Sequence, residues 1–246
     1  MKQTQGFTLV ELLAVIGIIG ILAAALFPQV TGAIMNANMT AVGNKGRDIY
    51  MAITQANLER EPLGLSALWP TSDAAEGGAA ADDPASHSST STDYFKFLAG
   101  VYGDKDSNGN YQPLADGFEL NKLSGAGVQP ANEPQSMQAR NNMWIIAKDV
   151  PDGLNEIVPI LVTRNINEGS LKKAGDNLTA NDSTPLTFST DGTRQTPFGE
   201  KGLVAIRRSG AIVKLRGASQ CKVGVLYGNT AFKLPTGTPG LSYIVP

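Results

Sequence analysis

The chain has 246 residues, of which 20 are Lys or Arg, 22 are Asp or Glu and one is Cys, and its formal net charge is −2. This charge argues against a nucleic-acid-binding protein, because neutralising phosphates requires a basic surface. A single Cys excludes an internal disulfide, a CxxC redox pair and a Cys-rich zinc site. At roughly 100–200 residues per domain, the length allows one large domain or two small ones.

The apolar residues are concentrated near the N-terminus, after a short polar segment that carries Lys2. Residues 7–27 read FTLVELLAVIGIIGILAAALF and contain one charged side chain, Glu11. A helix of that length spans about 31 Å, close to the hydrocarbon thickness of a bilayer. A secretory signal would have an apolar region of about 7–15 residues followed by a small-residue cleavage site. The sequence therefore favours a retained transmembrane helix.

Glu11 is the unusual residue of this segment. A carboxylate in the membrane interior costs on the order of 2.5–3.5 kcal/mol on insertion scales, so it usually marks a function. One interpretation is that Glu11 lies close enough to the membrane surface to reach water. The other is that a cut after Gly6 gives Phe7 a free α-amino group, which Glu11 of a neighbouring copy neutralises. Such an ion pair is stronger in lipid than in water, because the dielectric constant is low.

The string from Gly6 to Leu13, GFTLVELL, is similar to the class III signal of type IV pilins and type II secretion pseudopilins. The resemblance implies that a prepilin peptidase cuts between Gly6 and Phe7 and N-methylates Phe7. It also implies that Glu11 sets the register between subunits, and that Pro28 is the proline that the family commonly carries further along the same helix.

Beyond Pro28, apolar residues continue at close to helical spacing: Val30, Ile34, Ala37, Ala41, Ile49, Ile53 and Ala56. We expect this amphipathic helix to end near Glu61, because Pro62 disfavours helical geometry in the residue before it. The sequence thus predicts four segments: a leader at 1–6, a transmembrane helix at 7–29, an amphipathic extension at 30–61 and an extracytoplasmic head at 62–246.

The head is predicted to contain strands at 144–147, 157–163 and 223–227, with Pro159 confined to an edge or a bulge. Residues 203–215 predict a hairpin whose two-residue turn, Ser209-Gly210, pairs Ile206 with Val213 and Val204 with Leu215. Strands that follow a long helix predict an α+β, pilin-like fold, in which the helix packs on an antiparallel sheet.

The stretch 71–93 is poor in large apolar residues and predicts a solvated loop. It contains His87, the only His of the chain. We expect no catalytic role for this side chain, because nothing near it in the sequence would orient or activate it.

A loop in the head has side-chain oxygens at alternate positions, with Gly109 sixth: Asp104, Asp106, Asn108 and Asn110. This is the first half of an EF-hand calcium loop. The twelfth position is Ala115, where a bidentate Glu is needed, although Asp116 follows and would close a looser calcium site. The alternative is a turn held by local hydrogen bonds between Asp or Asn side chains and the backbone. The sequence leaves both open.

The resemblance implies a structural subunit of a type II secretion pseudopilus, not an enzyme, anchored once in the inner membrane with its head in the periplasm. Its implied partners are copies of itself, other pseudopilins, prepilin peptidase and the inner-membrane assembly platform. The lack of a disulfide and the candidate calcium loop favour a pseudopilin.

Two alternatives remain. One is a type IV pilin or minor pilin, used in adhesion, motility or DNA uptake. The other is a singly anchored extracytoplasmic enzyme or binding protein, whose helix would never be cut. The common phosphate-loop, HExxH and GxSxG signatures are absent from the sequence.

Overall fold

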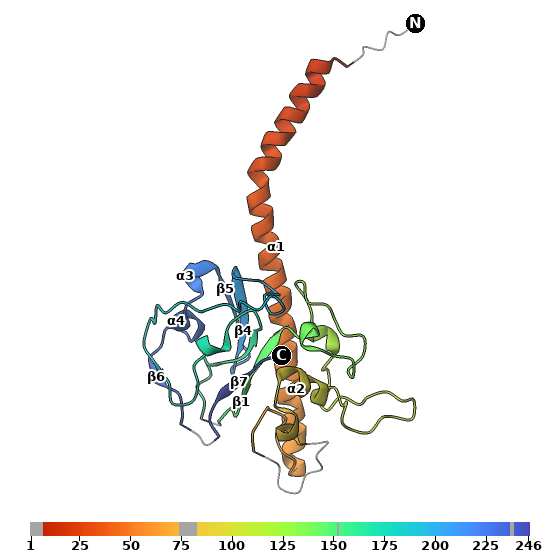
Figure 1. The fold of residues 1–246 in the computed structure, drawn as a ribbon, viewed down its shortest axis with the longest axis vertical. Helices are drawn as coiled ribbons and strands as arrows, with labels where there is room; N and C mark the ends of the chain where they lie inside the picture. Colours follow the sequence, from red (N-terminus) through yellow and green to blue (C-terminus); the bar gives the residue numbers. More distant parts are fainter. Residues whose placement is uncertain (1–6, 74–82, 152, 237–238) are drawn as a thin grey trace. The chain divides into compact units, whose positions relative to one another are not determined.

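The structure, a computed structural model, describes residues 7–73, 83–151, 153–236 and 239–246. The chain divides into two compact units, Met1–Asn38 and Met39–Pro246. The long helix α1, Leu9–Arg60, contributes to both units (Figure 1).

The first unit is built from the apolar part of α1, and its side chains are exposed. Leu9, Ile21 and Phe27 are each more than 70% exposed, at 77%, 73% and 72%. An 18-residue window of the helix has a mean hydropathy of 2.7 and no buried residue, so the helix is long and apolar enough to cross a membrane. Pro28 lies inside α1, and the Thr31 hydroxyl donates a hydrogen bond of 2.9 Å to its carbonyl.

In the second unit, α1 is amphipathic, as its sequence predicts. Its buried residues recur every three or four positions: Met39, Val42, Gly43, Gly46, Ile49, Ala52, Ile53 and Ala56. The helix ends at Arg60 and is followed by the 3-10 turn η1, Glu61–Leu63. Gly64, with φ of 69°, closes that turn through a hydrogen bond from its N–H to the Glu61 carbonyl.

The head contains an antiparallel sheet of five strands in the order β5-β4-β2-β1-β7. The strands are β1 Trp144–Lys148, β2 Pro159–Thr163, β4 Gly202–Arg207, β5 Ile212–Arg216 and β7 Ser242–Ile244. A smaller sheet pairs β3, Asn177–Leu178, with β6, Phe232–Lys233. The predicted α+β architecture, a long N-terminal helix with an antiparallel sheet, is confirmed.

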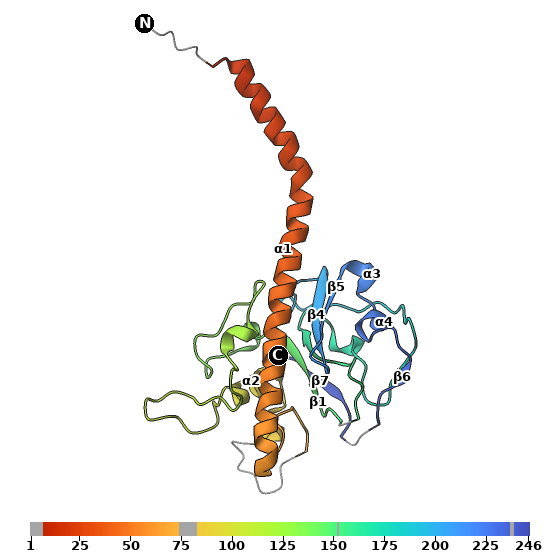
Figure 2. The same ribbon diagram turned by 180° about the vertical axis from the view of Figure 1, so that it is seen from behind.

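Short helices complete the head: α2 Ser91–Leu98, α3 Gly217–Gln220 and α4 Val223–Leu226 (Figure 2). The 3-10 turns are η2 Pro84–His87, η3 Leu120–Leu123, η4 Ala139–Asn141 and η5 Glu168–Ser170. The N-cap of α2 is Thr90, whose hydroxyl accepts a hydrogen bond of 3.1 Å from the Asp93 N–H.

Both faces of the strands β1, β2 and β4 are covered, so these strands are buried along nearly their whole length. On one face, Trp144 and Ile206 lie against α1 at Gly46. On the other face, Leu203, Ala205 and Leu215 belong to a second core that includes residues of α4. This two-sided burial is the reason that β1 and β2 read as continuous apolar runs rather than as alternating ones.

The predicted hairpin exists, but its predicted pairing is wrong by one residue. Ile206 pairs with Ile212, and Leu203 pairs with Leu215. The Arg207 N–H donates to the Ala211 carbonyl, and the Gly210 N–H donates to the Arg207 carbonyl, so that three residues form the loop instead of two. Gly210 has φ of 76°, the left-handed conformation that such loops require at this position. A shift of one residue moves side chains to the opposite face, so Leu203, not Val204, shares a face with Leu215.

The strand predicted at 223–227 is wrong, because Val223–Leu226 form the helix α4. The Gly224 N–H donates to the Asp182 carbonyl at 2.9 Å, and a Cβ at Gly224 would lie 2.6 Å from the Asp182 nitrogen. In the helical turn, Val223 and Leu226 both reach the second core. Tertiary contacts therefore override the β-propensity of the sequence.

The other predictions for the head are confirmed in part. Strand β2 begins at Pro159, and its register with β4 shifts between Pro159 and Leu161, as the predicted bulge requires. The loop predicted at 71–93 is wrong in its second half, where η2 and the start of α2 lie. The structure does not describe residues 74–82.

Candidate functional site: the start of α1 and its seat in the head

The first turn of α1 is closed by a capping box between Thr8 and Glu11. The Thr8 N–H donates to Glu11 Oε2 at 2.9 Å, and the Glu11 N–H donates to Thr8 Oγ1 at 3.3 Å. The Thr8 hydroxyl also donates to Glu11 Oε2 at 2.7 Å. These reciprocal bonds satisfy backbone donors that the start of a helix leaves unpaired.

The capping box fixes where the Glu11 carboxylate lies. It is held at the N-terminal end of α1, where it accepts a hydrogen bond from the backbone N–H of Thr8, the residue after Phe7. A negative charge is favourable there, because the helix dipole is positive at its N-terminus. Phe7 is 73% exposed, and Gly6 lies outside the described residues.

The close packing of α1 against the sheet of the head depends on two glycines. A Cβ at Gly46 would lie 2.6 Å from Trp144 Cη2 and 2.8 Å from Ile206 Cγ1, and a Cβ at Gly43 would lie 2.6 Å from Ile212 Cγ2. Glycine at these positions therefore lets the helix backbone approach the sheet more closely than any other residue would.

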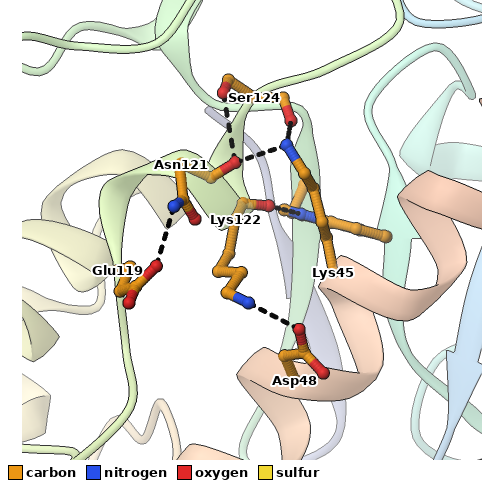
Figure 3. Close-up of polar contacts among 7 residues, drawn as sticks. Lys45, Asp48, Glu119, Asn121, Lys122 and Ser124 are labelled. Atoms are coloured by element: carbon orange, nitrogen blue, oxygen red, sulfur yellow. Dashed lines mark hydrogen bonds and ion pairs between the residues drawn. The ribbon is translucent and has the colours of Figure 1, made fainter.

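Polar contacts join the same part of α1 to the turn η3 (Figure 3). Lys45 Nζ donates to the carbonyls of Asn121 and Ser124 at 2.7 and 2.8 Å. Lys122 Nζ forms an ion pair of 2.6 Å with Asp48 Oδ2. Burial, and then the positive charge of Lys122, lower the pKa of Lys45, whereas the hydrogen bond to Asp48 raises the pKa of Lys122. No motif or spacing in the sequence marks these residues as contact residues.

We predict that Lys45→Met lowers the free energy of unfolding by about 1–2 kcal/mol, because it removes a charged donor from two backbone carbonyls. Lys122→Met should cost less, about 0.5 kcal/mol, because its ion pair is exposed to solvent. Chemical unfolding of the full chain in detergent, followed by tryptophan fluorescence, measures both. Equal losses for the two variants would contradict this ranking.

The residues of the candidate calcium loop form a tight turn. Asp106 Oδ1 accepts hydrogen bonds from the N–H groups of Asn108 and Asn110 at 2.9 and 2.8 Å. The backbone of Lys105 pairs with that of Tyr111. Among the residues that the structure describes, no group of three His, Cys, Asp or Glu side chains is placed to hold a metal ion. Asp104 and Asp116 are exposed on either side of this turn.

The calcium site thus stays a prediction, and a melting experiment tests it. If Asp104, Asp106, Asn108, Asn110 and Asp116 bind calcium, then calcium raises the melting temperature of the full chain, because a ligand that binds the folded state stabilises it. Asp116→Asn should remove this increase. The same melting temperature in calcium and in a chelator would leave the hydrogen-bonded turn as the whole role of the loop.

The side chain of His87 packs against two aromatic rings of the head. Its ring stacks on that of Tyr102, with 3.9 Å between the ring centroids, and lies 5.3 Å from that of Phe97.

Comparison with known proteins supports the interpretation of the N-terminus. Residues 1–27 match the family model of the prokaryotic N-terminal methylation motif. The chain carries a type IV prepilin N-terminus. Over 42 residues it is 55% identical to the type IV wide pilus major component PilA4 of Thermus thermophilus, a match that covers 17% of this chain and 32% of that protein. The chain thus spans about a third of the length of this relative. No solved structure matched the chain.

Proposed function

We propose that this protein is a structural subunit of a type II secretion pseudopilus and has no enzymatic activity. The observation that carries the proposal is an exposed apolar helix that begins with a methylation motif and has Glu11 as its one charged residue before Pro28. In this proposal, prepilin peptidase cuts between Gly6 and Phe7 and methylates the new α-amino group. The positive charge of Lys2 favours the cytoplasmic side for residues 1–6, which would leave the head in the periplasm.

Assembly follows from the chemistry of the first unit. A carboxylate and an α-amino group in lipid are each costly alone, and they stabilise each other as a pair. Glu11 of one copy would therefore neutralise the amine of Phe7 in the next, at the end of the helix where the capping box holds the carboxylate. A Cβ at Gly17 or Gly20 would meet no atom within 4 Å, so these positions leave room for the close approach of another helix.

A type IV pilus is the second candidate function, because the relative PilA4 is named as a major component of such a pilus. The two candidates differ in what is lost when the gene is deleted. A pseudopilin deletion abolishes export of secreted proteins and leaves surface fibres intact, whereas a pilin deletion removes the fibres and leaves export intact. Immunoblots of the culture medium and electron microscopy of the cells distinguish them. Loss of fibres alone would overturn the secretion proposal.

The proposed partners follow from the same argument: copies of this chain, other pseudopilins, prepilin peptidase and the inner-membrane assembly platform. A singly anchored enzyme or binding protein remains the alternative from another class. That alternative predicts an uncut N-terminus and full function after replacement of Glu11, whereas the filament proposal predicts cleavage and a requirement for the carboxylate.

A further inference from the structure

The head contains a polar cavity of about 630 Å³, a volume in the range of small-molecule sites. It lies between the segment 127–132, the segment 136–141, which includes η4, and Arg164, the residue that follows β2. Two of the described residues that line it are arginines, Arg140 and Arg164, and none of them is Asp or Glu. Glu133, exposed in the same loop, does not line the cavity. Because a cleft lined by charge of one sign concentrates ions of the opposite sign, this cavity favours a negatively charged ligand.

Arg164 is the buried cation of this cavity and is only 3% exposed. Its Nη1 donates to the carbonyls of Ala139 and Asn142 at 2.6 and 2.9 Å. Its Nε donates to the Thr196 carbonyl at 3.0 Å, and its Nη2 donates to the Thr196 hydroxyl at 2.7 Å. A guanidinium has five N–H groups, so these four hydrogen bonds leave one N–H of Nη2 for a further acceptor.

The four acceptors of the Arg164 guanidinium are neutral oxygens, so its charge lacks a directly bonded counter-ion. In the described parts of the chain, the ion pairs are Lys122–Asp48 and Arg194–Glu168, and neither includes Arg164. Burial, and then the positive charge of Arg194, lower the pKa of Arg164, and the more distant carboxylate of Asp191 acts in the opposite direction. Arginine is almost never fully buried in proteins without a paired anion. An oxyanion in the cavity would supply that charge in a geometry that suits a guanidinium.

Hydrogen bonds hold the walls of the cavity in place. The Asn141 side-chain amide donates to the carbonyls of Gln129 and Pro130 at 3.2 and 3.4 Å, and Asn141 Oδ1 accepts from the Gln138 N–H at 3.1 Å. Arg140 lies in η4 between Asn141 and Ala139, whose carbonyl accepts from Arg164. The same turn is thus tied to both sides of the cavity. A cavity formed in advance loses little free energy to ordering when a ligand binds.

We propose that this cavity binds an oxyanion, the carboxylate or phosphate group of a polar small molecule. Arg164 donates the remaining N–H of Nη2 to the oxyanion at the buried side of the cavity, and Arg140 contributes the second positive charge from its exposed side. The amides of Gln129 and Asn132, which also line the cavity, are suited to hydroxyl groups on the rest of the ligand. This binding site goes beyond the proposed filament function, because each head would carry it whether or not the chain assembles.

Isothermal titration calorimetry of the full chain in a non-ionic detergent tests this site, with citrate and inorganic phosphate as separate probes at constant ionic strength. We expect saturable binding of at least one probe, at one site per chain. Saturation with citrate alone assigns the site to a carboxylate, and saturation with phosphate alone assigns it to a phosphate group. Arg140→Gln should weaken binding at least about tenfold, because it removes a charged hydrogen-bond donor. Arg47→Gln, the same substitution at an exposed position of α1, should leave the affinity unchanged.

Arg140 is the residue to change first, because replacing Arg164 would also release η4 and Thr196. Arg164→Gln should abolish binding where circular dichroism shows that the variant is folded. Three results would overturn the site: no binding of either probe at about 10 mM, weaker than a millimolar dissociation constant; equal affinity for the wild-type chain and Arg140→Gln; or equal losses in Arg140→Gln and Arg47→Gln, which would mean a general effect of charge. None of these results bears on filament assembly, so the proposed function stands or fails separately.

Discussion

Replacing Glu11 by Gln should abolish filament formation while cleavage after Gly6 continues. Gln can still accept the hydrogen bonds of a capping box, so this substitution removes the charge and keeps the helix start intact. Leaving the amine of Phe7 without its partner costs on the order of 3–5 kcal/mol, as for other buried charges that lose a partner. The expected loss of filaments is therefore more than about 100-fold. Electron microscopy and sedimentation of assembled material measure it.

Thr8→Val is the matched control. It removes the hydroxyl of the cap but leaves the Glu11 carboxylate, so it should cost about 1 kcal/mol of helix stability and should leave filaments present. The opposite pattern, with filaments from Glu11→Gln and none from Thr8→Val, would mean that capping and not charge is the role of Glu11. Both variants need their cleavage confirmed, because the substitutions lie close to the peptidase site.

Replacing Gly46 by Leu should destabilise the head by about 3 kcal/mol or more, because the side chain has no space between α1 and the sheet. Its Cβ alone would lie 2.6 Å from Trp144 Cη2 and 2.9 Å from Trp144 Cζ2, and both these atoms belong to a fully buried side chain. Chemical unfolding of the full chain in detergent, followed by tryptophan fluorescence, reports this directly, since Trp144 itself is displaced.

Asn44→Leu adds a side chain of the same size on the exposed face of the same helical turn. It should change the free energy of unfolding by less than about 0.5 kcal/mol. Equal destabilisation by Asn44→Leu and Gly46→Leu would contradict this account, because the loss would then not depend on close packing against Trp144.

The sequence predicts the parts of the fold that local patterns determine. The spacing of apolar residues and Pro62 place the end of α1 within one residue of Arg60. Periodicity and Pro159 likewise locate β1, β2 and the bulge. The spacing Thr8-x-x-Glu11 is also that of a capping box. The apolar residues on either side, however, mark Glu11 first as a charge in a membrane helix.

Contacts between distant residues explain what the sequence does not predict. The helix α4 depends on the approach of Gly224 to Asp182, and the hairpin register depends on the left-handed conformation of Gly210. Lys45 bonds to backbone carbonyls 76 and 79 residues away. Any residue type supplies a backbone carbonyl, so no pattern of side chains marks such a partner.

Mass spectrometry of the protein isolated from cell membranes tests the central claim most directly. The account predicts a mature chain that begins at Phe7, lacks residues 1–6 and carries one additional methyl group on its α-amino nitrogen. A chain that retains residues 1–6 in every recovered form, with no methylated Phe7, would contradict the account.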